Sequence, residues 1–182
     1  MHDVQAARGA SLRRASRLTQ LLSVALAVLA LDVVTKLVAV RELSDREPVS
    51  LLGGVLTLRL VRNPGAAFGM AQGLTVVLTV IALVVVVAIL RMASRLRNGW
   101  WAAALGLVLG GALGNLGDRL FRAPGPGRGH VVDFLELPHW PVFNLADSAI
   151  VLAGALMVVL SLSGVPHSAT PDDGNDAREN SG

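Results

Sequence analysis

The stretch LTQLLSVALAVLALDVVTKLVAV, residues 18–40, decides the fold, because it is an almost unbroken apolar run with only two ionisable side chains, Asp32 and Lys36. A helix needs ~20 mostly apolar residues to cross a hydrocarbon core of ~30 Å. Three further apolar blocks approach this length, at residues 74–90, 100–119 and 143–164. The sequence therefore predicts an all-α membrane protein with four transmembrane helices.

The composition supports a membrane protein and excludes several other classes. The chain has 182 residues, of which 53% are hydrophobic and only 16% charged. The net charge of +3 does not indicate a nucleic-acid partner, because the arginines are scattered along loops without interleaved aromatic residues. The absence of cysteine excludes disulfides, thiol catalysis and thiolate metal sites.

Charge distribution predicts the topology. Arg13, Arg14 and Arg17 precede the first span, and Arg91, Arg95 and Arg97 separate the second from the third, so the positive-inside rule places both segments in the cytoplasm. We expect a basic cytoplasmic segment at 1–17, a membrane domain at 18–164 and a disordered cytoplasmic tail at 165–182. The basic N-terminus followed by an apolar run is also typical of a cleavable secretory signal. Retention is favoured, because the apolar run continues through residue 40.

The predicted outer connection at 41–73 contains its own structural signal. In VSLLGGVLTLRLVR, residues 49–62, leucines alternate with Thr57, Arg59 and Val61 after a Gly53-Gly54 turn. This period of two predicts a β-hairpin. With one apolar and one polar face, the hairpin would form a small extracytoplasmic platform on the membrane surface.

Ionisable residues inside a span cost roughly 2.5 to 3.5 kcal/mol each and therefore need a partner or a purpose. Asp32 and Lys36 are four residues apart, so they can pair on one helical face. A structural ion pair and a role in holding substrate explain this pair equally well.

The third span combines a glycine stripe with a polar end. Gly106, Gly110 and Gly114 recur every fourth residue, which favours close approach of a neighbouring helix. The polar end comprises Asn115, Asp118 and Arg119. We interpret this group as mainly architectural, with Arg119 as the counter-charge that keeps Asp118 ionised.

The last two predicted spans are separated by a segment with two acids. Asp133 follows two valines late in the connection at 120–142, and Asp147 lies one turn beyond Asn144 at the start of the fourth span. Each acid alone would be a loop cap or a helix-dipole partner. Two neighbouring carboxylates instead share a proton and supply an acid and a base at neutral pH, which could activate water against a peptide carbonyl. Asn63, in the turn Asn63-Pro64-Gly65, is a candidate binding amide near this pair.

Five blocks, LDVVTK, NPGAAFGM, GNLGDR, VVDF and FNLADS, recur in an order and spacing that resemble the bacterial lipoprotein signal peptidase (signal peptidase II) family. The resemblance implies a metal-independent aspartic endopeptidase of the plasma membrane, inhibited by globomycin, without a cofactor. It implies that Asp133 and Asp147 are catalytic and that a prolipoprotein is cleaved before its diacylglyceryl-modified cysteine. By the same resemblance, the residues that line or support the site are Asn63, Asn115, Asp118, Arg119, Asn144 and Ala146, with Asp32 and Lys36 more remote.

The chain departs from the family pattern at Val33, where many relatives have glutamine, and in the long loop RAPGPGRGH, residues 122–130. We expect a monomer that acts at the extracytoplasmic face, in contact with membrane lipid. Three rival hypotheses are a proton-relay transporter, a magnesium enzyme using Asp118, Asp133 and Asp147, and a purely structural bundle. The first would require acids across the whole bilayer, the second conflicts with Arg119 beside Asp118, and the third leaves the polar motifs unexplained.

Overall fold

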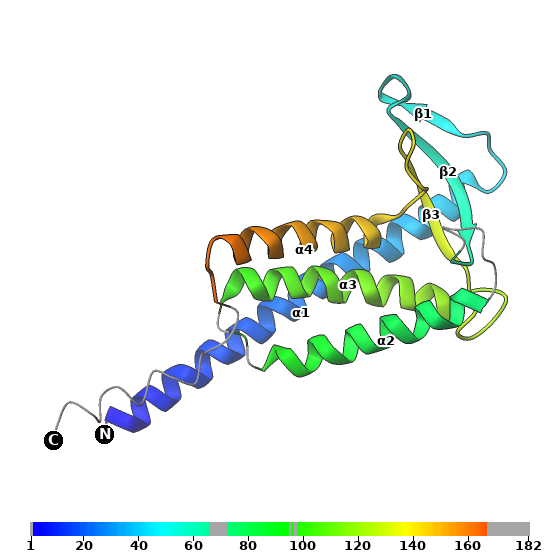
Figure 1. The fold of residues 1–182 in the computed structure, drawn as a ribbon. Coiled ribbons are helices and arrows are strands. Elements are labelled where there is room, and N and C mark those ends of the chain that lie inside the picture. The colour runs from blue at the N-terminus through cyan, green and yellow to red at the C-terminus, as the bar shows by residue number, and fades with distance from the viewer. Residues whose placement is uncertain (1, 66–72, 95, 97, 167–182) are drawn as a thin grey trace.

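The computed structural model describes residues 2–65, 73–94, 96 and 98–166. Its four helices are α1 (His2–Leu43), α2 (Gly73–Ala93), α3 (Gly99–Phe121) and α4 (Leu145–Leu162), arranged as a bundle (Figure 1). Each contains a segment long and apolar enough to cross a membrane: Ala15–Leu43, Thr75–Ala93, Gly99–Phe121 and Leu145–Leu162. The predicted fold class is therefore confirmed. Apart from Val165 and Pro166, the predicted C-terminal tail lies outside the described residues.

The central helix is α3, which buries much of its length against the other helices. Its glycine stripe explains how closely α1 approaches. A Cβ added to Gly106 would come within 2.7 Å of the Leu21 carbonyl oxygen, and one added to Gly110 within 2.6 Å of the Ala25 carbonyl oxygen. The predicted packing role of the stripe is thus confirmed, because only glycine allows this approach.

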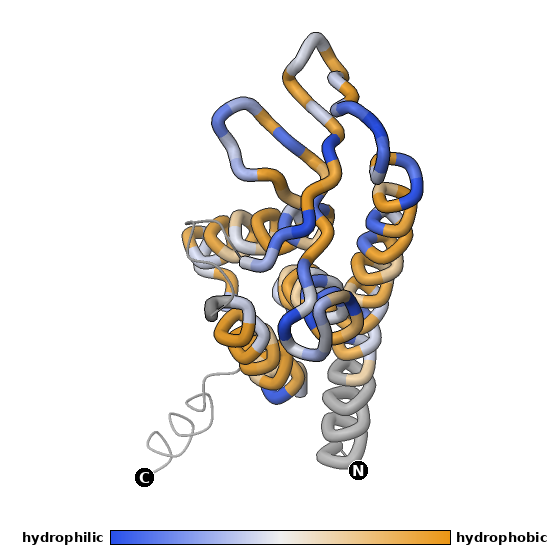
Figure 2. Tube along the Cα trace, turned by 90° about the vertical axis from the view of Figure 1, so that its right-hand side faces the viewer, coloured by the Kyte–Doolittle hydropathy of each residue, from blue (hydrophilic) through white to orange (hydrophobic). Residues whose placement is uncertain are grey.

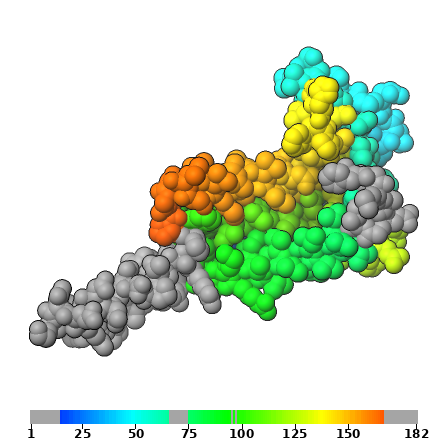
Figure 3. All heavy atoms as spheres, in the orientation of Figure 1, coloured from blue at the N-terminus to red at the C-terminus, as the bar shows by residue number. Residues whose placement is uncertain are grey.

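The outer surfaces of α1, α2 and α4 remain apolar. Large hydrophobic side chains stay exposed along these helices, among them Leu26, Val84 and Val151. Figure 2 shows the hydrophobic colouring along the helices, and Figure 3 shows the part of the bundle surface formed by α2 and α4. An exposed apolar surface of this extent suits a lipid environment and would be unfavourable in water.

A small antiparallel sheet lies at one end of the bundle (Figure 1). Its strands are β1 (Val49–Leu51), β2 (Leu56–Asn63) and β3 (Val131–Glu136), in the order β1-β2-β3. The predicted hairpin is confirmed as β1 and β2, joined through a short 3-10 turn in which Gly53 and Gly54 have positive φ angles of 67° and 92°. The third strand was not predicted.

The sheet is attached to the end of α1 by a second hydrophobic cluster. Val132 and Phe134 of β3 pack with Ala39 of α1, and Leu60 of β2 contacts this cluster. The apolar alternation of β2 therefore serves to attach the sheet to the bundle. As a result, β3 is held across the ends of the helices, where α3 finishes and α4 begins.

Candidate active site

Asp147 is positioned by the start of α4. Asn144 is the N-cap residue, and its side-chain oxygen accepts a hydrogen bond of 3.0 Å from the Asp147 backbone N–H. The Asp147 carboxylate in turn accepts a hydrogen bond of 3.2 Å from the Asn144 backbone N–H. This reciprocal capping box fixes both side chains at the helix N-terminus, where the helix dipole favours a carboxylate.

Asp133 is held on β3, in a strand and not in the loop that the sequence suggested. Its side chain is only 2% exposed. One carboxylate oxygen accepts a hydrogen bond of 2.8 Å from the Asn63 side-chain amide, and the other accepts one of 2.7 Å from the Asn144 side-chain amide. The predicted binding residue Asn63 is therefore a direct partner of Asp133.

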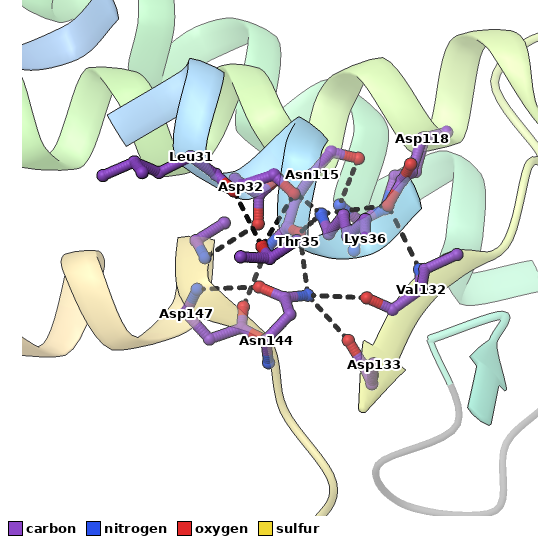
Figure 4. Close-up of polar contacts among 12 residues, drawn as sticks. Leu31, Asp32, Thr35, Lys36, Asn115, Asp118, Val132, Asp133, Asn144 and Asp147 are labelled. Carbon is purple, nitrogen blue, oxygen red and sulfur yellow. Dashed lines mark hydrogen bonds and ion pairs between the residues drawn. The ribbon is translucent and has the colours of Figure 1, made fainter. Parts of the chain in front are cut away.

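Two asparagines connect the carboxylates of Asp133 and Asp147 (Figure 4). The Asn144 amide that donates to Asp133 also donates to the side-chain oxygen of Asn115, at 3.1 Å. The Asn115 amide donates to Asp147, at 2.8 Å. Two acids separated by 14 positions in the sequence (147 − 133) thus belong to one hydrogen-bonded cluster.

The surroundings of Asp133 favour its protonated form. The pKa of Asp133 is raised to about 6, mainly by burial and also by the nearby charge of Asp147, while the hydrogen bonds from Asn63 and Asn144 and the charge of Lys36 act in the opposite direction. An unpaired charge in a poorly solvated site is costly, so a proton is retained to higher pH than on an exposed aspartate. Asp133 can consequently act as a proton donor under mildly acidic conditions.

A buried ion cluster lies directly behind the asparagines. Lys36, 1% exposed, lies 2.8 Å from Asp32 and 2.9 Å from Asp118 and donates a hydrogen bond of 2.9 Å to the Asn115 side-chain oxygen. Lys36 thus makes two ion pairs and one hydrogen bond, which together neutralise and partner its buried ammonium group. The contacts of Lys36 therefore agree with the structural ion pair expected from the i, i+4 spacing and extend it to a second helix.

Asp32 and Asp118 also hold backbone groups of the site. The Asp32 carboxylate accepts a hydrogen bond of 3.0 Å from the Ala146 N–H at the start of α4. Asp118 accepts one of 3.1 Å from the Val132 N–H, next to Asp133. Ala146 is fully buried, so it supports the site through its backbone and does not line it.

Arg119 was expected to be the counter-charge of Asp118, but among the described residues it forms no direct ion pair with Asp118, although the two groups still attract each other. The cations paired with Asp118 are Lys36 and Arg122. Arg119 is half-buried, donates a hydrogen bond of 3.2 Å to the Asn115 carbonyl oxygen, and interacts electrostatically most strongly with Asp147, then Asp133, and only then Asp118. Helical spacing alone missed this, because the partner of Arg119 depends on how α4 and β3 pack against α3.

The arrangement does not suit a divalent cation at Asp118. Two cationic side chains already contact this carboxylate, so a metal ion would meet electrostatic repulsion. Among the described residues, no group of three His, Cys, Asp or Glu side chains is arranged to hold a metal.

An apolar groove of about 220 Å³ lies between α1, α3 and α4. It is lined by Val28 and Leu31 of α1, Leu107 of α3, and Leu145, Ser148, Ala149 and Leu152 of α4. The groove lies next to Asp147 in the sequence of α4 and continues away from the sheet. An extended apolar ligand could therefore lie between these helices with its polar end near the acids.

Comparison with known proteins gives consistent matches over most of the chain. A family model described as Signal peptidase (SPase) II matches residues 24–163. Lipoprotein signal peptidases of Mycobacterium tuberculosis (strain ATCC 25618 / H37Rv) and Mycobacterium avium (strain 104) are each 60% identical over 148 residues, covering 81% of this chain and 73% and 81% of theirs. A solved structure described as a bacterial membrane enzyme has a TM-score of 0.69 and 26% identity, covering 78% of this chain and 92% of that one.

Proposed function

This chain belongs to the signal peptidase II family, and we propose that it removes lipoprotein signal peptides with an Asp133/Asp147 pair that activates water. The family supports a membrane-bound protease that cleaves lipoprotein signal peptides. The observation that carries the aspartic mechanism is the joint positioning of the two carboxylates by Asn144 and Asn115. This arrangement resembles the shared-proton pairs that activate water in aspartic proteases.

The two acids have different environments, which suggests different roles. Asp147 is half-buried, whereas Asp133 is buried and has a pKa raised to about 6. In the proposed reaction, ionised Asp147 takes a proton from water while the water oxygen attacks the scissile carbonyl carbon. Protonated Asp133 then donates its proton to the departing amine as the C–N bond breaks. Transfer of one proton from Asp147 to Asp133 restores the starting state.

Substrate binding would strengthen this division of roles. A bound peptide excludes water from Asp133 and raises its pKa further, so the proton donor is retained near neutral pH. Arg119 interacts with both acids and would stabilise the negative charge that remains on the pair. Asn63 holds Asp133 from the sheet side, where the peptide would enter.

The position of Asp133 and Asp147 relative to the membrane suits a lipid-modified substrate. Both acids lie outside or at the very end of the apolar helical segments, since one such segment ends at Phe121 and the next begins at Leu145. A diacylglyceryl group on the substrate cysteine could remain in the bilayer while the peptide bond meets water. The apolar groove between α1, α3 and α4 is a candidate site for the apolar part of the substrate.

We further propose that the pair faces the extracytoplasmic side, that both termini are cytoplasmic, and that the monomer is the active unit. The arginines that flank the opposite end of the bundle support this orientation through the positive-inside rule. The carboxylate cluster is built from a single chain, which supports a monomer.

The decisive experiment is a gel-shift assay on a diacylglyceryl-modified prolipoprotein in detergent, with wild type, Asp133→Asn and Asp147→Asn. Both variants should insert and fold but lose cleavage. Asp45→Asn is the matched control, because Asp45 is an exposed acid at the same end of the molecule. Wild-type cleavage should stop with globomycin and continue in EDTA. Cleavage by either dyad variant would refute the assignment, and loss of activity in EDTA would favour a metal mechanism.

A further inference from the structure

A second polar cavity lies near the site and has no role in the proposed reaction. It has a volume of about 430 Å³ and is lined by Arg62, Arg122, Ala123, Pro124, His130 and Val132. Its polar lining is basic, with side chains contributed by β2, the residue after α3, and the loop before β3. None of the described residues that line it is acidic, so the cavity attracts anions.

The cavity lies on the opposite face of the sheet from the proposed catalytic pair. Neighbouring residues of a strand point to opposite faces. Asn63 and Asp133 contact each other on one face, so Arg62 and Val132, which are partners in the β2–β3 register, belong to the other. A ligand in this cavity would consequently not occupy the position of the scissile peptide.

The two arginines are available to a ligand. Arg122 uses its Nε to pair with Asp118, and within the described part of the chain no hydrogen bond or ion pair engages its two terminal nitrogens. The Arg62 side chain, which is exposed, likewise has no such partner among the described residues. The acid that contacts Arg122 is Asp118, and the charge of Asp118 is also neutralised by Lys36. The balance of charge at the cavity is therefore positive.

The cavity lies at the boundary between apolar and polar surface. Arg122 directly follows the apolar segment Gly99–Phe121, and the neighbouring Phe121 side chain is 87% exposed. An exposed aromatic residue that precedes Arg122 in the chain, at a cavity lined by two arginines, suits a phospholipid at the membrane interface, with its phosphate at the arginines and its acyl chains on the apolar side.

From these observations we propose that the cavity between Arg62, Arg122 and His130 binds the phosphate of an anionic phospholipid headgroup. The planar guanidinium groups suit phosphate oxygens, which accept paired hydrogen bonds. This lipid would stand beside the sheet and steady the β2–β3 pair that holds the catalytic face. The proposal does not depend on the identity of the reaction.

The test is a calorimetric titration of the purified full-length protein, in a neutral maltoside detergent, with dioctanoyl phosphatidylglycerol. We expect one saturable site, weakened about tenfold or more by Arg62→Gln and by Arg122→Gln. Arg41→Gln is the matched control, since Arg41 is exposed near the same end of the bundle and the substitution removes the same charge. Equal weakening by Arg41→Gln and Arg62→Gln would overturn the site. Arg62→Gln guards against misfolding, because the Arg62 side chain has no hydrogen bond or ion pair to lose within the ranges that the structure describes.

Two further ligands distinguish a lipid from a free phosphate. Dioctanoylglycerol, which lacks the phosphate, should bind wild type and Arg62→Gln equally. Glycerol 3-phosphate should bind more weakly than the lipid, and Phe121→Ala should weaken only the lipid. If glycerol 3-phosphate binds as tightly as the lipid, the lipid assignment is wrong. Asp133→Asn should bind lipid normally, so failure of the catalytic proposal leaves this result unaffected.

Discussion

The side-chain amide of Asn144 donates a 2.7 Å hydrogen bond to the carboxylate of Asp133, although the two residues belong to a helix cap and a strand. The same residue caps α4 and, through the reciprocal bond to its backbone, fixes Asp147. Asn144 thus holds both proposed catalytic acids in one geometry. The residue that caps α4 therefore also fixes the positions of the Asp133 and Asp147 side chains relative to each other.

Asn144→Ala should lower kcat by about a hundredfold, because small displacements of reacting groups have effects of this size. Losing an N-cap should also cost about 1 kcal/mol of stability. Asn98→Ala is the control, since Asn98 caps α3 in the same way, accepting a bond of 2.7 Å from the Trp100 N–H, far from the acids in the sequence. It should reduce thermal stability and leave kcat unchanged. Equal kcat values for the two variants would contradict the role of Asn144 in positioning the two acids.

The raised pKa of Asp133, about 6, predicts the pH dependence of activity. If protonated Asp133 is the donor, kcat/KM should fall as the pH rises above about 6, by up to tenfold per pH unit. Infrared detection of the protonated carboxyl band should follow the same midpoint. In Asp147→Asn the neighbouring charge is lost, so the midpoint should move down toward the ordinary value. A midpoint below 4 in the wild type would remove Asp133 as the acid.

The same pKa predicts how stability varies with pH. The folded protein binds this proton more tightly than the unfolded chain, whose ordinary value is 3.8, so folding is favoured at low pH. This contribution is complete below about pH 4 and is lost as the pH rises through about 6, a change on the order of 3 kcal/mol. The melting temperature of Asp133→Asn should therefore depend less on pH over this range. Identical slopes for variant and wild type would argue against a buried titrating Asp133.

Asp118→Asn should reduce folded yield and melting temperature more than turnover. The carboxylate contacts Lys36, Arg122 and the Val132 N–H, and an amide would remove one of the two carboxylates that neutralise buried Lys36 and the only one paired with Arg122 among the described residues, at a cost of up to about 3 to 5 kcal/mol. Glu136→Gln is the comparison, because it breaks the ion pair between Arg59 and Glu136, which is 2.9 Å long and more exposed to solvent. This pair should contribute at most about 1 kcal/mol to the free energy of unfolding. Thermal unfolding in detergent measures both. A fully stable but inactive Asp118→Asn would instead assign Asp118 to the chemistry.

Gly110→Ala should impair folding, because its Cβ would lie 2.6 Å from the Ala25 carbonyl oxygen and 2.7 Å from the Val28 Cβ. The helices would have to separate, and the expected loss is about 1 to 3 kcal/mol or more. Gly117→Ala in the same helix is the control, since no atom lies within 4 Å of its added Cβ. It should be neutral or stabilise α3 by up to about 1 kcal/mol. Equal melting temperatures would show that the stripe does not control packing.

The sequence predicted those parts of the site that depend on neighbours along the chain. The Asp32–Lys36 pair, the position of Asp147 in the first turn of the fourth helix and the hairpin of β1 and β2 follow from local spacing, and the structure contains each of them. It did not predict β3, because the short run Val131–Glu136 has no alternating pattern and forms a strand only beside β2. The partners of Arg119 and Asp118 were missed for the same reason.

By itself, then, the sequence determined the four apolar helices and the hairpin of β1 and β2, and it pointed to Asp133 and Asp147 as candidate acids, since hydrophobic length, residue alternation and helical spacing act over short distances. Only the tertiary structure decided that Asn63, Asn115 and Asn144 join those acids into one cluster, and that Lys36 pairs with Asp118 as well as Asp32. Such contacts depend on how closely α3 approaches α1 and α4 and on where β3 docks. Packing across the whole molecule sets both.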